Sequence, residues 1–277
     1  QSGAGAYLDR EIGASLVRSL SKLAARNRAT AFHVVHGALA VLLARLSGSE
    51  DVTIGTAVSG RDDPLLADVV GMFVNTVVLR SRIRPDATAD EIVADSRAVS
   101  ARALSNSHVS FEQVVEAVSP ERSLSASPLF QVIVSWQDDL LGTLDSGFGA
   151  RLLDARVPAA KFDLHISFTQ KPGADGPVIL AEFCYATDLF DRATIAALAD
   201  QFERVLAAIV SGDRTRVSAI DLVPAARVRE LAAVVPAAGP RTLRDLVAEL
   251  EARPDRSVVA ISGARTVTRN VFEARTN

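Results

Sequence analysis

The 277-residue chain carries 30 basic and 33 acidic residues, and 48% of its residues are hydrophobic. This apolar content is enough for a sizeable buried core and excludes a generally disordered chain. The formal net charge of −3 argues against nucleic acid as a partner, because binding to phosphates needs a clustered basic surplus.

Local patterns in the first half of the chain predict alternating helices and strands. The first predicted helix is marked by the helical spacing of Ile12, Leu16, Leu20 and Leu23. A second helix is predicted over 30–46, followed by strands at 52–58 and 73–79 and by helices over 88–104 and 111–117. The helix over 30–46 is apolar on nearly every face, which predicts that it is buried. The closely spaced valines of the strand at 73–79 are typical of an interior strand.

The second half continues the mixed pattern up to about residue 222. After a polar loop at 119–128, strands are predicted at 129–136, 162–168 and 178–185, with a hairpin turn at 171–176 and a helix over 191–212. A short helix near 226–233 and a stretch of small residues and prolines at 235–240 then indicate an interdomain linker over 223–241. Beyond it, a helix at 242–253, a strand at 257–261 and the start of a helix at 271–277 are predicted. This mixture predicts an α/β fold.

The ends of the chain and its single cysteine bear on where the protein works. Cys184 stands alone, which excludes an internal disulfide and a cysteine-cluster zinc site and fits a reducing cytoplasm. No signal peptide is visible, and the longest apolar stretch, residues 38–44, is too short for a bilayer, so no membrane partner is expected. The missing initiating Met and an end in mid-pattern predict a piece of a longer protein.

Motifs that would identify a reaction are scarce. The sequence has no G-x-S-x-G elbow, P-loop or dinucleotide fingerprint. His33 and His36 have a spacing that can hold a metal, but no third ligand is apparent, so we predict no metal site. His165 lies within a predicted strand and is either catalytic or a hydrogen-bonded structural histidine.

The segment 70–80 places polar residues inside an apolar run. Asn75 and Thr76 would be buried there, and each unsatisfied polar group costs on the order of 1–3 kcal/mol. Gly71 permits a bend or a close backbone approach before them. Two interpretations remain open: a hydrogen-bonded kink that stabilises the core, or polar groups held at the wall of a tunnel or cleft.

Six ordered segments carry a resemblance to a known family. They are Asp51–Arg61, Gly71–Thr76, His108–Glu112, Glu121–Gln131, Lys161–Leu164 and Tyr185–Asp191. With these, the chain resembles the condensation domain of non-ribosomal peptide synthetases, which has a chloramphenicol-acetyltransferase-like fold. Ser110 and Ala126 depart from the family's usual Pro and Arg at those positions.

The resemblance implies only one lobe of that domain. The family's catalytic signature, H-H-x-x-x-D-G, lies in the first lobe, and this chain has no adjacent histidines. Residues 1–222 would therefore be the C-terminal lobe, an α+β sandwich with a mixed sheet covered by helices, and would contain no catalytic residue. The resemblance implies that a substrate tunnel is lined or supported by Gly71, Phe73, Asn75, Thr76, Gln131 and Asp163.

The implied reaction joins two substrates that arrive on carrier domains. Each is held on a phosphopantetheine arm, and an acceptor amine attacks a donor thioester to form an amide. The partners would be the N-terminal lobe, peptidyl carrier domains and a downstream adenylation domain, whose start residues 242–277 resemble. The chain itself would bind no cofactor and would be inactive alone. Two alternatives are a catalytically silent domain that recruits a partner enzyme or carrier protein, and an epimerisation domain, against which the adenylation-like segment argues.

Overall fold

The structure is a computed structural model that divides into two compact units, Gln1–Leu222 and Val223–Asn277. It describes residues 2–61, 63–66, 68–119, 127–137, 139, 156–212, 215–233, 258–262 and 265–268. The first unit contains the main sheet. The second contains α6 (Ala225–Ala233) and an antiparallel pair, β7 (Val258–Ser262) and β8 (Arg265–Thr268).

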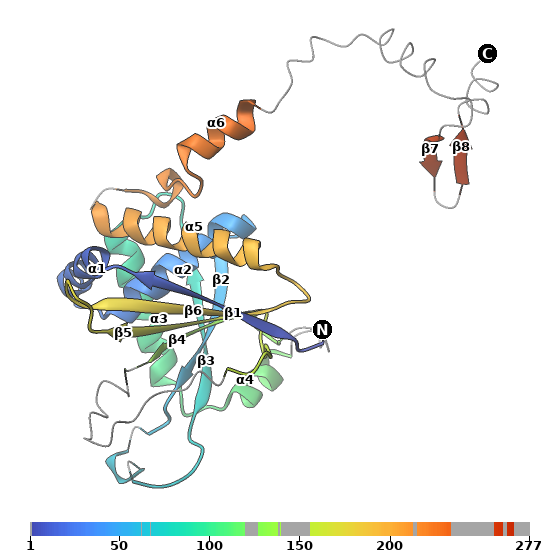
Figure 1. Cartoon of the computed structure of the whole chain (residues 1–277). Coiled ribbons are helices and arrows are strands. Elements are labelled where there is room, and N and C mark those ends of the chain that lie inside the picture. The colour runs from blue at the N-terminus through green and yellow to red at the C-terminus, as the bar shows by residue number, and fades with distance from the viewer. Residues whose placement is uncertain are drawn as a thin grey trace. The chain divides into compact units, whose positions relative to one another are not determined.

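Six strands of the first unit form one mixed sheet in the order β1-β6-β5-β4-β2-β3 (Figure 1). The strands are β1 (Gly5–Ile12), β2 (Asp51–Val58), β3 (Asn75–Arg82), β4 (Val132–Gln137), β5 (Leu164–Lys171) and β6 (Val178–Ala186). The neighbours β2, β4 and β5 run parallel, whereas the remaining pairs are antiparallel. The two edges of the sheet are therefore β1 and β3.

Four long helices pack against one face of this sheet. They are α1 (Ala14–Arg26), α2 (Ala31–Ser47), α3 (Ala89–Ser105) and α5 (Arg192–Ser211), while the shorter α4 (Phe111–Val118) precedes β4. Alternate strand residues such as Ile54, Ile166 and Phe183 are fully buried with helix residues such as Leu39 and Phe202. Because side chains alternate along a strand, the residues between them lie on the opposite face, which we call the second face.

Side-chain caps explain where several helices begin. The Thr88 backbone N–H donates to Glu91 Oε2 at 2.8 Å in a capping box, and Asp191 accepts from the Thr194 backbone N–H at 2.6 Å. The predicted starts of α3 and α5 are thus confirmed. Gly48 ends α2 with a φ of 70°, a conformation that favours glycine.

The main differences from the predicted elements concern the sheet. The strand β1 was not predicted, and Ile12 ends it rather than belonging to the first helix, because β1 pairs with a strand far along the sequence. The prediction that 73–79 is interior was wrong: β3 is an edge strand that begins at Asn75, and Val74 is 56% exposed. The strand β4 begins after Leu129, whose φ of 70° cannot continue a strand.

Several predicted segments fall outside the described residues. These are most of the polar loop (120–126), the end of the linker (234–241), and the helical patterns at 242–253 and 271–277. Within the described part, no single helix is both long and apolar enough to cross a membrane. Only α1 and α2, taken together as a pair bent by 102°, meet those two criteria.

Candidate functional site

Asn75 begins β3, and its amide uses its full hydrogen-bonding capacity. Its Nδ2 donates to the backbone carbonyls of Ser107 and Val109, both at 2.8 Å. Its Oδ1 accepts from the backbone N–H of Phe111 at 3.2 Å and of Thr76 at 2.8 Å. These bonds fasten the start of an edge strand to the turn before α4 and satisfy a partly buried amide.

The chain before Asn75 is organised by Arg61. The guanidinium donates to the backbone carbonyls of Leu66, Val69 and Gly71, the last at 3.2 Å, and lies 4.4 Å from the centre of the Phe73 ring. A cation over an aromatic face adds to the hydrogen bonds that hold the loop. Gly71 and Phe73 therefore support the loop before β3, and Gly71 itself is exposed.

Three phenylalanines from separate motifs form a chain of ring contacts. The rings of Phe111 and Phe130 lie 5.5 Å apart between centres, and Phe130 and Phe162 are also 5.5 Å apart. Gly55 leaves room for this packing, because a Cβ there would stand 2.4 Å from the Phe130 ring. The backbone N–H of Phe111 donates to Asn75 Oδ1, so these ring contacts are linked to the hydrogen bonds at the start of β3. The sequence alone does not reveal this convergence, although each phenylalanine lies inside a motif.

Gln131 and Asp163 lie just before the parallel strands β4 and β5. The exposed side chain of Gln131 donates to the Ser127 backbone carbonyl at 3.1 Å. The backbone carbonyl of Gln131 accepts from the Leu164 backbone N–H at 3.3 Å. The Asp163 carbonyl accepts from the Ala186 backbone N–H at 3.1 Å. The candidate residues thus form two groups, one at the start of β3 and one at the starts of β4 and β5, connected by the aromatic chain.

The second face of the sheet carries a polar pair at its centre. His165 Nε2 lies 2.9 Å from Ser135 Oγ, and Ser167 beside them is only 7% exposed. Burial lowers the pKa of His165, so its imidazole is neutral at pH 7. A neutral imidazole and a hydroxyl can bind or orient polar groups. His165 was weighed from sequence as catalytic or structural, and the structure shows it hydrogen-bonded.

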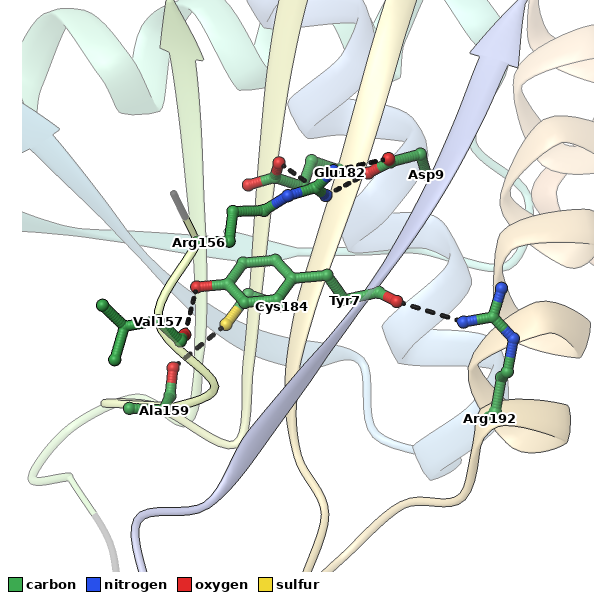
Figure 2. A network of polar contacts seen from close by, with 8 residues as sticks. All are labelled: Tyr7, Asp9, Arg156, Val157, Ala159, Glu182, Cys184 and Arg192. Carbon is green, nitrogen blue, oxygen red and sulfur yellow. Dashed lines mark hydrogen bonds and ion pairs between the residues drawn. The ribbon is translucent and has the colours of Figure 1, made fainter. Parts of the chain in front are cut away.

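At the β1–β6 side of the same face, Arg156 holds the segment 156–159 against strands β1 and β6 (Figure 2). Its guanidinium donates to both carboxylate oxygens of Asp9, at 2.8 and 3.0 Å, and to Glu182 at 3.1 Å. The Tyr7 hydroxyl donates to the Val157 carbonyl at 3.0 Å. These residues were not predicted from the sequence, because two of them belong to β1, which was itself not predicted.

Cys184 and Tyr7 lie beneath this segment and are not activated nucleophiles. Burial raises the pKa of the Cys184 thiol and also that of the Tyr7 hydroxyl, so both are protonated at pH 7. The Cys184 thiol lies 3.5 Å from the Ala159 carbonyl (Figure 2). Among the residues that the structure describes, no group of three or more His, Cys, Asp or Glu side chains could hold a metal ion.

The layered sheet and the motif residues that meet on it define a class, the chloramphenicol-acetyltransferase-like fold. More specifically, the chain belongs to the condensation domain family: the family model described as Condensation domain matches residues 4–232. The predicted resemblance to the condensation domain and the predicted fold class are thereby confirmed.

The curated relatives are peptide synthetases much longer than this chain. An isonitrile lipopeptide synthase of Mycobacterium tuberculosis is 34% identical over 98% of this chain and 11% of its own length. A dimodular nonribosomal peptide synthase of Bacillus subtilis is 37% identical over 74% of this chain and 9% of its own length. The chain therefore spans about a tenth of each.

Solved structures match the same fold. A four-domain nonribosomal peptide synthetase aligns over 98% of this chain and 22% of its own, with a TM-score of 0.75 and 22% identity. The X-domain from teicoplanin biosynthesis aligns over 80% of this chain and 50% of its own, with a TM-score of 0.72 and 27% identity. The condensation domain of the Monacolin K polyketide synthase aligns over 78% and 49%, with a TM-score of 0.67 and 18% identity.

Proposed function

We propose that residues 1–222 are the C-terminal lobe of a synthetase condensation domain and help form the tunnel where an amide bond is made. The observation that carries this proposal is the convergence of the motifs: Asn75, Phe111, Phe130 and Phe162 come from four segments and form one bonded and packed cluster. This chain aligns with only 49% and 50% of two solved condensation-type domains. Coverage of half of each domain supports the proposal that this chain contains one of two lobes.

The reaction needs an acceptor amine and a donor thioester, each on the phosphopantetheine arm of a carrier domain. The amine nitrogen attacks the thioester carbonyl, a C–N bond forms, the C–S bond breaks, and the amine's proton ends on the released thiol. This lobe would align the two tethered reactants, since holding reactants in place removes much of the entropic barrier. Gly71, Phe73, Asn75 and Thr76 would support one part of its wall, and Gln131 and Asp163 another.

The second face of the sheet offers polar groups for this role. Ser135, His165 and Ser167 lie together there, and the neutral imidazole of His165 lies 2.9 Å from the Ser135 hydroxyl. A neutral, hydrogen-bonded surface suits alignment of a thioester and an amine without covalent chemistry of its own. The reactive histidine would be supplied by the N-terminal lobe of the same domain.

Residues 242–277 would be the start of an adenylation domain after the linker at 223–241. The alignment with the mycobacterial synthase supports this order, because it covers 98% of the chain and so continues past residue 232, where the condensation match ends. The order of condensation before adenylation suits an elongation module. Such a module would work in the cytoplasm.

A recruiting function is the second candidate. The X-domain of teicoplanin biosynthesis has been solved in complex with OxyB, and in that structure it is 26% identical to this chain with a TM-score of 0.70. A silent condensation-like domain would bind a partner enzyme with the same lobe. A binding assay between the intact domain and its carrier proteins, run beside the amide assay, separates the two functions.

The test uses two purified carrier proteins, one loaded with an aminoacyl donor and the other with an aminoacyl acceptor. Mass spectrometry of the acceptor carrier detects dipeptide formation. The chain alone should give no product, whereas a polypeptide extended upstream by a second lobe should give it. Product from residues 1–277 alone would overturn the one-lobe proposal. Carrier binding by the extended domain without any product would favour recruitment.

A further inference from the structure

A pocket on the helix-covered side of the sheet lies apart from the motif cluster. Its volume is about 300 Å³, and it is enclosed by the start of α2, the end of α3 and the strands β2, β3 and β4. Phe32, Val58, Val77, Leu104 and Trp136 give it a mainly apolar lining. It is small but falls in the size range of ligand pockets.

The position of the pocket within the sheet also favours a ligand. Val58 ends β2 and Trp136 is the penultimate residue of β4, and these two strands are parallel neighbours. The pocket is thus at the carboxyl ends of parallel strands, where open α/β sheets commonly bind ligands. It is on the opposite side of the sheet from the Ser135–His165 pair.

His33 lines this pocket, and the position of its imidazole proton follows from its hydrogen bonds. Its Nδ1 accepts from the backbone N–H of Thr30 at 3.0 Å in a capping box. Because that nitrogen accepts, the proton of the neutral imidazole is on Nε2. Burial, together with the charge of Arg97, lowers the pKa of His33 and keeps it neutral at pH 7. Within the described residues, Nε2 has no hydrogen-bond partner.

A second polar group lines the same pocket without a partner. Ser100 on α3 is 4% exposed, and its hydroxyl makes no hydrogen bond among the described residues. Buried polar groups are rarely left unpaired in folded proteins, since each costs about 1–3 kcal/mol. An apolar pocket with two available polar groups is complementary to an apolar molecule that carries an oxygen.

We propose that this pocket binds an acyl group whose apolar chain packs against Phe32, Val77 and Trp136 and whose oxygen accepts a hydrogen bond from His33. The acyl group comes either as a free carboxylate or as a thioester on a pantetheine arm. Both forms share an apolar chain with a terminal carbonyl oxygen. The proposal concerns binding alone and does not depend on amide formation.

Trp136 is the sole tryptophan of the chain and provides the signal. The 277-residue chain is titrated with octanoate, octanoyl-pantetheine and octanol while tryptophan fluorescence is recorded. A saturable change with octanoate or octanoyl-pantetheine is expected, and the tighter of the two identifies the source of the acyl group. No saturable change with either would overturn the proposal.

Two substitutions of His33 separate its role as a donor from its role in the helix cap. Glu and Gln at this position both preserve the capping box with Thr30. His33→Gln keeps an N–H donor and should bind octanoate within about threefold of wild type, whereas His33→Glu should bind it at least about tenfold more weakly because of charge repulsion. Octanol binding should be unchanged in both. Equal octanoate affinity in His33→Glu and wild type would overturn the assignment.

A third substitution tests the pocket itself. Ser100→Leu fills the cavity and should abolish the response to all three probes, with circular dichroism confirming the fold. If this variant does not fold, Leu104→Glu replaces it, because Leu104 lines the pocket and is 55% exposed. The added carboxylate should then weaken octanoate binding more than octanol binding. An unchanged octanoate response in the folded variant would contradict the proposed location.

Discussion

Replacing Asn75 with alanine distinguishes the two interpretations that the sequence leaves open. Three bonds of its side chain reach a distant segment, the carbonyls of Ser107 and Val109 and the N–H of Phe111. A net contribution of about 1 kcal/mol per hydrogen bond gives a loss of about 3 kcal/mol in the free energy of unfolding. That is a substantial part of the stability of an ordinary domain.

Urea unfolding followed by circular dichroism measures this loss as a lower midpoint at an unchanged slope. Gln131→Ala is the matched control, because this exposed amide makes one side-chain hydrogen bond, to Ser127. It should change stability by less than about 0.5 kcal/mol. A loss below about 1 kcal/mol for Asn75→Ala would refute a supporting role and favour direct contact with substrate.

Three further predictions concern the loop before β3, a buried histidine and the segment over Cys184. Gly60→Ala should cost at least about 2 kcal/mol in urea unfolding, because φ is +63° and a Cβ would stand 1.9 Å from the Phe73 carbonyl oxygen. Burial lowers the pKa of His36 from 6.5 to about 4. Because the unfolded chain takes up this proton first, stability should fall by about 3 kcal/mol as pH drops from 6.5 to 4, and His36→Phe should flatten that dependence. Arg156→Ala should speed the reaction of Cys184 with a thiol reagent by loosening the segment above it, and an unchanged rate would contradict that role.

The helices and their beginnings were largely predictable because their signals are local. The capping pair Thr88–Glu91 and the aspartate Asp191 mark helix starts within four residues of sequence. The strand β1 was not predictable from the sequence, because its polar and apolar residues alternate only weakly. Its pairing partner β6 lies at the other end of the domain sequence. An edge strand such as β3 is mistaken for an interior strand when its sequence contains closely spaced valines.

The candidate site was predictable as a set of motifs but not as an arrangement. The polarity of Asn75 within an apolar run marked it as important, yet the run could not indicate that its partners lie 32 to 36 residues away. The same holds for Phe111, Phe130 and Phe162, whose ring contacts join distant segments. The polar residues of the second face could not be grouped without knowing the register of β4 against β5, which places Ser135 beside Ser167.

The proposed function requires that residues 1–222 form one lobe of a two-lobed domain. An experimental structure of the polypeptide extended upstream by about two hundred residues, the size of a second ordinary domain, tests it most directly. We expect a second lobe of the same layered fold, with its histidine motif opening into a tunnel shared with the cluster around Asn75. An upstream segment that folds otherwise, or a tunnel closed entirely within residues 1–222, would contradict it.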